Sequence, residues 1–145
     1  MTPDLQRFID AQQPVYAQVC AELRDGIKRS HWMWFIFPQL AGLGHSPTAQ
    51  YFAIANKVHA AAYWKHPVLG ERLRECTGLV NSHTELSAAQ MFGYPDYLKL
   101  HSSLSLFHDV APQEQIFTQA LRQLYGGELD EATVRLLQDS SGLAT

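Results

Sequence analysis

Residues 26–70 hold the clearest concentration of side chains that could bind a ligand. This segment contains no Asp or Glu, and it carries four bases and four histidines: Lys28, Arg29, Lys57, Lys65, His31, His45, His59 and His66. It also holds eight of the sixteen aromatic residues, including all three tryptophans. A basic segment rich in rings favours an anionic ligand with a flat ring. The alternative is that the rings form the core and the bases lie on a solvated rim.

A second polar group follows Pro95, where a helix is expected. Asp96, Lys99 and Ser103 recur at i, i+3 and i+7, so they lie near one face of that helix, with Ser102 beside them. Small hydroxyls beside a lysine are typical of the wall of a ligand pocket. The alternative is a solvated face with an ordinary ion pair between Asp96 and Lys99.

A glycine-containing loop leads into the helix expected at Pro47. Gly42, Gly44 and Ser46 lie in this loop. Glycines let backbone N–H groups face outward, and a helix start adds positive partial charge, so the loop favours an anion. It is not a nucleophile elbow, because Thr48 stands where that motif needs its second glycine. The alternative role of Ser46 is to cap the helix.

Other classes of site are poorly supported. No CxxC, HExxH or EF-hand pattern occurs, so neither a metal site nor a cofactor is predicted. The longest apolar run has six residues, from Trp32 to Phe37, so no membrane span is expected. A nucleic-acid ligand is not expected either. Cys20 and Cys76 are expected to be reduced, buried thiols in a cytoplasmic protein, because no export signal is visible.

The elements that must position these residues are expected to be short helices. Caps, prolines and apolar stripes of helical period predict helices over 3–11, 14–26, 47–64, 67–80, 87–92, 95–108, 112–125 and from residue 130. Residues 30–38 have a strand-like composition, but no second strand of similar quality exists. We therefore expect a buried irregular or short helical segment there. The whole predicts one all-α domain over 1–138 with about seven or eight helices, no substantial sheet, and a frayed tail over 139–145.

The sequence also resembles a known family. Residues 31–39, His-Trp-Met-Trp-Phe-Ile-Phe-Pro-Gln, are similar to the hallmark of a bacterial family of unknown function whose members are often labelled "calpastatin". The similarity covers nearly the whole chain and continues through Gly42-Leu43-Gly44, Ser46, His66 to Leu69, Phe92-Gly93, Asp96, Lys99 and Ser102-Ser103. The resemblance implies a compact helical fold and no established activity. The label itself does not fit, because an inhibitor of that type is a long, disordered repeat chain.

Two further features of the resemblance bear on function. The family usually has a glutamate at the position of His59. If that glutamate were catalytic, this member would be impaired or would use another group. A fainter similarity, over about the middle half of the chain, is to NADAR-type helical domains, which are linked to ADP-ribose and NAD-derived metabolites. This similarity agrees with the separate argument from charge and aromatic content.

Together these observations give a lead hypothesis and a rival. The lead is a pocket for a small, anionic, phosphorylated, nucleotide-like ligand such as an ADP-ribose derivative, with hydrolysis of an N-glycosidic bond as a further hypothesis. His31 and Asp96 are the candidates for proton transfer. The candidate ligand-binding residues are Trp32, Trp34, Gln39, Gly42, Gly44, Ser46, Lys99, Ser102 and Ser103. The rival is a non-enzymatic interaction module in which the aromatic segment is core or interface.

Overall fold

A computed structural model describes residues 4–143 of the protein, with side chains described for residues 4–139. Within that part of the chain there are ten helices and no strand. Helices make up 65% of the structure, which confirms the all-α prediction. The helices are α1 (Gln6–Gln12), α2 (Tyr16–Asp25), α3 (Met33–Ile36), α4 (Pro47–Tyr51), α5 (Lys57–Lys65), α6 (Leu69–Asn81), α7 (Ala88–Phe92), α8 (Asp96–Val110), α9 (Gln115–Tyr125) and α10 (Glu131–Leu143).

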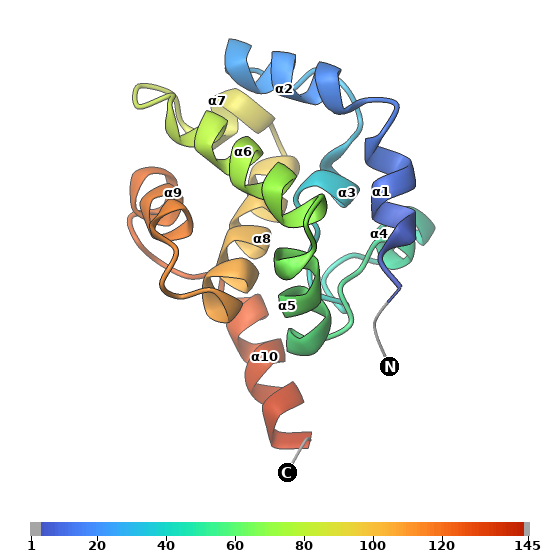
Figure 1. Cartoon of the computed structure of the whole chain (residues 1–145). Helices are drawn as coiled ribbons and strands as arrows, with labels where there is room; N and C mark the ends of the chain where they lie inside the picture. The colour runs from blue at the N-terminus through green and yellow to red at the C-terminus, as the bar shows by residue number, and fades with distance from the viewer. Residues whose placement is uncertain (1–3, 144–145) are drawn as a thin grey trace.

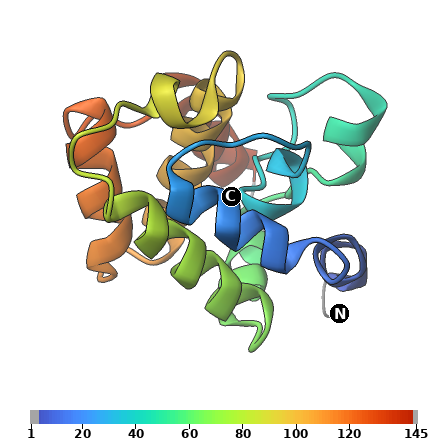
Figure 2. The same cartoon turned by 90° about the horizontal axis from the view of Figure 1, so that it is seen from above.

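Helix α8 runs through the centre of the molecule, and α5, α7, α9 and α10 pack against it (Figure 1). Its buried side carries Leu100, Leu104 and Phe107. The ring of Phe107 lies 5.4 Å from that of Tyr63 in α5 and 6.1 Å from that of Phe117 in α9. Helix α6 packs on α5 and α9, and α2 lies alongside α6 when the molecule is seen from above (Figure 2). The core therefore lies between α8 and the helices that surround it.

The single helix predicted over 47–64 is wrong, because the chain forms two helices there, α4 and α5. Between them the backbone of Ile54 accepts a hydrogen bond from the N–H of Ala41 and donates one to the carbonyl of Gln39, each at 2.8 Å. The Asn56 side chain then caps α5. This pairing with the segment after α3 interrupts the helix, and it raises the number of helices above the predicted seven or eight.

The aromatic segment at 30–38 contains the short helix α3, as expected. Trp32, Met33 and Phe37 are each only 1% exposed, so these side chains form core. Trp34, on the other side of the short helix, is half-buried. Most of the segment therefore packs inside the molecule, and Trp34 is the tryptophan of this segment with more contact with solvent.

A buried carboxylate from α2 holds the start of this segment. Glu22 accepts hydrogen bonds from the backbone N–H groups of Arg29 and Ser30, at 2.7 and 3.1 Å, and from the Trp32 indole at 2.9 Å. The Ser30 hydroxyl and the Gln18 amide donate two more, at 2.6 and 3.0 Å. Burial alone would raise the pKa of Glu22, but these hydrogen bonds outweigh it and lower the pKa to about 2. Glu22 therefore fixes the loop that enters the aromatic segment.

The ends of the chain leave two expectations untested. The start predicted for the first helix, at residue 3 with a cap at Thr2, lies outside the described residues. The fraying expected for 139–145 stays a prediction, since α10 reaches Leu143 and residues 144–145 lie outside the described part. No helix between residues 4 and 143 is long and apolar enough to cross a membrane.

Candidate functional site

Two lysines form ion pairs with the carboxylate of Asp96, and each lysine also lies against a tryptophan ring. Lys28 places its Nζ 2.8 Å from Asp96 Oδ2, and Lys99, nearly one turn along α8, places its Nζ 3.8 Å from Oδ1. The Lys28 ammonium also lies 5.2 Å from a ring centroid of Trp32, and that of Lys99 lies 5.3 Å from a ring centroid of Trp34. These distances are typical of cation–π contacts. We call these five residues the lysine–tryptophan cluster.

The cluster carries one more positive than negative charge. The Lys28 side chain is 8% exposed and lies closest to Asp96, whereas the Lys99 side chain is 25% exposed and lies 1 Å farther away. Lys28 therefore offsets most of the charge of Asp96, and the Lys99 ammonium supplies the excess charge near the surface. The indole N–H of Trp34 is buried and has no hydrogen-bond partner among the described residues.

A groove of about 300 Å³ adjoins the cluster at Lys99. Its walls come from the segment after α3, the first turns of α8 and the start of α10. Four of the predicted ligand-binding residues line it: Gln39, Gly44, Lys99 and Ser102. The other lining residues are Leu43, Pro95, Leu98, Asp130 and Ala132, so much of the surface is apolar with polar groups at a few points. Such a surface is typical of small-molecule sites.

Asp130 organises one end of the groove. Its Oδ2 accepts hydrogen bonds from the Ser102 hydroxyl at 3.1 Å, and from the backbone N–H and hydroxyl of Thr133 at 3.1 and 2.6 Å. Its own N–H donates to Ser105 Oγ at 2.9 Å. Asp130 thus caps α10, as the sequence predicts, and joins that helix to α8. Because Asp130 is an acid, a bound anion is expected at the Lys99 end instead.

Glycine is required at one lining position. A Cβ on Gly44 would approach the Cβ of Ala49 to 2.5 Å, which is too close for a side chain at position 44. The approach brings the loop onto the first turn of α4 and forms the groove wall. The sequence singled out Gly44 for exposing backbone N–H groups, whereas the structure shows a need for close packing.

Two predicted binding residues lie in the interior, away from the groove. Trp32 is 1% exposed, and its indole N–H is bonded to Glu22, so it presents no open ring face for a ligand. Ser103 is also 1% exposed, and its hydroxyl has no hydrogen-bond partner among the described residues. The helical spacing predicted that Ser103 lies with Asp96 and Lys99, but Ser103 is buried whereas Lys99 is partly exposed to solvent.

Trp34 and Asp96 of the lysine–tryptophan cluster lie outside the groove lining, and so do three other predicted residues. His31 is exposed and does not line the groove. Gly42 has a φ of 103°, which favours glycine, and lies beside Leu136 of α10. The Ser46 hydroxyl accepts a hydrogen bond from the N–H of Ala49 at 3.1 Å, so the capping alternative is confirmed.

The family model for proteins of unknown function, DUF1810, matches residues 2–137. The chain belongs to the DUF1810 family. It is also similar to a crystal structure of the conserved hypothetical protein Rv1873 from Mycobacterium tuberculosis, with 52% identity and a TM-score of 0.92. That similarity covers 93% of this chain and 96% of the other. No curated protein matches the sequence.

The DUF1810 assignment supports a family of unknown function, in agreement with the main resemblance seen in the sequence. It supports neither the "calpastatin" label nor the fainter resemblance to NADAR-type domains. The crystal structure of the relative has a fold closely similar to the one described above. Function in this DUF1810 protein must therefore be argued from its own site.

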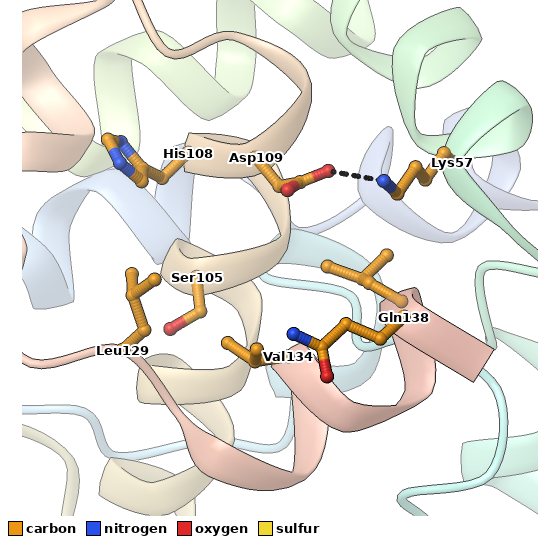
Figure 3. A pocket seen from close by; sticks show the side chains of 8 residues that line it. Lys57, Ser105, His108, Asp109, Leu129, Val134 and Gln138 are labelled. Carbon is orange, nitrogen blue, oxygen red and sulfur yellow. Dashed lines mark ion pairs between the residues drawn. The ribbon is translucent and has the colours of Figure 1, made fainter. Parts of the chain in front are cut away.

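A second cavity of about 310 Å³ in this DUF1810 protein was not predicted (Figure 3). It lies between α8 and α10 and is lined by Lys57, Ser105, His108, Asp109, Leu129, Val134, Leu137 and Gln138. Lys57 and Asp109 form an ion pair of 3.6 Å at its edge. Ser105, His108 and Asp109 lie at i, i+3 and i+4, so they share one face of α8. This spacing is the sequence pattern that could have indicated the second cavity.

His59, where the resemblance to the family implies a glutamate, is 7% exposed in α5. Its Nδ1 accepts a hydrogen bond from the N–H of Ala55 at 2.9 Å, so the neutral ring carries its proton on Nε2. Burial and then the charge of Arg7 lower the pKa of His59. His59 does not line the groove. Within residues 4–139, no three His, Cys, Asp or Glu side chains are grouped to hold a metal ion.

Proposed function

We propose that this DUF1810 protein binds a small phosphorylated, nucleotide-like molecule in the groove beside Lys99. The observation that carries the proposal is the position of the Lys99 ammonium. It adjoins an apolar groove, and the closest charge partner of Asp96 is Lys28 instead. A lysine whose charge is only partly offset attracts a phosphate.

The other walls of the groove suit the remainder of such a ligand. Leu43, Pro95 and Leu98 provide apolar surface for a flat ring. Gln39 and Asp130 provide hydrogen-bonding groups for ribose hydroxyls. A cavity of about 300 Å³ is at the small end of ligand sites, so one nucleoside phosphate moiety would fill it. The rest of a larger molecule such as ADP-ribose would lie outside.

The proposal is for binding and does not include hydrolysis of an N-glycosidic bond. Each oxygen of Asp96 faces a lysine ammonium, so neither is directed at a molecule in the groove. His31 does not line the groove. Proton transfer by either residue therefore gains no support from this arrangement.

Isothermal titration calorimetry tests the proposal with AMP, ADP-ribose, ribose 5-phosphate and adenosine. We expect Lys99→Ala to weaken binding of the three phosphate-bearing compounds about 10- to 100-fold, which is the range for a charged hydrogen bond. The affinity for adenosine should be nearly unchanged. Ala132→Phe should fill the groove and weaken binding of all four compounds, because Ala132 is an exposed residue of the groove lining. The matched control is Lys57→Ala, which removes a lysine from the second cavity.

Two results would contradict the proposal. One is that none of the four compounds binds the wild-type protein. The other is binding that neither Lys99→Ala nor Ala132→Phe weakens relative to Lys57→Ala. Circular dichroism of each variant should match the wild type, since both substituted residues of the groove lie at the surface.

An interaction module is the second candidate, and one observation favours it. Tyr94 is 79% exposed and Leu98 is 46% exposed, beside Pro95 at the edge of the same groove. Exposed apolar side chains beside a groove are typical of protein contact sites. If Tyr94→Ser abolishes co-purification of a partner while nucleotide binding is absent, this second function replaces the first.

A further inference from the structure

The two cysteines, which are distant in sequence, meet between α2 and α6. These helices pack side by side (Figure 2). Cys20 lies on α2 and Cys76 on α6, and the two thiols contact the same hydrogen-bonded pair of side chains, Glu75 and Tyr16. Both thiols are free and buried, which confirms that part of the sequence prediction. Their meeting was not predicted, because nothing in the sequence indicates that α2 packs on α6.

Two further polar side chains complete the cluster. Cys20 Sγ lies 3.8 Å from Glu75 Oε1, and Cys76 Sγ lies 3.8 Å from the Tyr16 hydroxyl. The Tyr16 hydroxyl also donates a hydrogen bond of 2.5 Å to Glu75 Oε1. None of these four residues lines the groove beside Lys99. We call them the thiol cluster.

The two thiols have different surroundings. Cys20 is 5% exposed, whereas Cys76 is fully buried. The neighbouring Cys76 thiol is the main cause that lowers the pKa of Cys20 to about 7; burial opposes this effect and Tyr16 supports it. The same contact with Cys20, together with burial, raises the pKa of Cys76. Cys20 is therefore the thiol that ionises more readily and that a small reagent reaches first.

We propose that the thiol cluster is an oxidation site for small peroxides, with Cys20 as the attacking sulfur and Cys76 as the resolving one. The Cys20 proton passes to the Glu75 carboxylate, and the thiolate attacks one peroxide oxygen. An S–O bond forms, the O–O bond breaks, and the leaving oxygen takes up the proton to become water or, from an organic peroxide, an alcohol.

Cys76 completes the reaction. Its sulfur attacks the sulfur of the Cys20 sulfenic acid, an S–S bond forms, and the S–O bond breaks. The departing hydroxide takes the Cys76 proton and becomes water. Two thiols are oxidised by two electrons, and the peroxide is reduced. The two sulfur atoms must come to about 2.05 Å from each other for this bond. A dithiol reductant reverses the process.

Mass spectrometry of the intact wild-type protein tests this directly with hydrogen peroxide as the probe. We expect a loss of about 2 Da, for two hydrogens, and peptide mapping should find Cys20 joined to Cys76 in one chain. Dithiothreitol should restore the original mass. The oxidised form should also have a higher Tm, because the bond closes a long loop in the unfolded chain. Protein unfolded in urea is the control and should form the bond more slowly.

Variants distinguish the attacking thiol from the resolving one. Cys76→Ser should accumulate a sulfenic acid on Cys20 that dimedone captures, and Cys20→Ser should give little capture on Cys76. The conclusion is overturned if the folded wild type gains oxygen without losing hydrogen, forms dimers, or forms the bond no faster than the urea-unfolded chain. It is also overturned if Cys20→Ser and Cys76→Ser capture dimedone equally. The wild-type experiment needs no variant to fold.

Discussion

Replacing Glu22 by glutamine should show how much one buried carboxylate contributes to this fold. Glu22 is 4% exposed and accepts five hydrogen bonds from the loop and from its own helix. Glu22→Gln keeps the shape of the side chain and one carbonyl oxygen. It replaces the second oxygen by an NH₂ group, which faces donors such as the Ser30 hydroxyl and the Gln18 amide.

The expected magnitude follows from the pKa of Glu22, which is lowered from the ordinary 4.5 to about 2. That difference corresponds to about 3 kcal/mol of folding free energy, and screening by nearby solvent reduces it to about 2 kcal/mol. The clash between donors adds about 1 kcal/mol that does not depend on pH. Glu22→Gln should therefore lower the free energy of unfolding by about 3 kcal/mol at pH 7.

The pH dependence provides the sharper test. Because the folded-state pKa of Glu22 lies below its unfolded value, its contribution is complete above pH of about 4.5 and is lost as the pH falls toward about 2. The difference in unfolding free energy between wild type and Glu22→Gln, measured by urea unfolding, should thus become smaller below that pH. Glu85→Gln, at an exposed position, is the control. A gap that stays constant as the pH falls, or no gap at pH 7, would refute the reasoning.

Two further substitutions test the histidine and a helix contact. Burial and then the nearby charge of Arg7 lower the pKa of His59. The stability that the neutral ring contributes is therefore present above the ordinary pKa of 6.5 and is lost as the pH falls below it. His59→Gln should flatten the decline of unfolding free energy just below pH 6.5, whereas exposed His45→Gln should not; identical profiles would contradict this. A Cβ on Gly70 would lie 2.0 Å from the backbone oxygen of Trp64, so Gly70→Ala should destabilise by more than about 3 kcal/mol in chemical denaturation. Gly78→Ala, which meets nothing within 4 Å, should be neutral or slightly stabilising; equal losses at both glycines would exclude the steric explanation.

Local signals predicted most helix ends because those ends depend on nearby residues. Ser87 and Gln90 form a capping box at the start of α7. Gly26 and Gly126 end α2 and α9 in the left-handed conformation, as their positions indicated. The break between α4 and α5 could not be found in this way, because it depends on pairing between Ile54 and a segment more than ten residues earlier.

The candidate site was predictable only in part, for a similar reason. Helical spacing brought Lys99 and Ser102 together, and the groove includes both. The same spacing suggested Lys99 as the ion-pair partner of Asp96, yet Lys28 lies closer and is more buried. Lys28 reaches Asp96 because Glu22 fixes the loop between α2 and α3. That arrangement is tertiary and has no local signature.

The acid-free segment at 26–70 now has a different explanation from the one that first suggested an anionic ligand. Three of its four bases pair with acids from outside the segment: Lys28 with Asp96, Arg29 with Asp25 and Lys57 with Asp109. The charge asymmetry along the sequence is therefore largely balanced in space, and opposite charges at these distances cancel most of the field that the segment alone would produce. What remains near the groove is the ammonium of Lys99, which lies outside the segment. The proposed anion binding therefore depends on Lys99 more than on the composition of the aromatic segment, and Lys99→Ala is the variant that separates the two explanations.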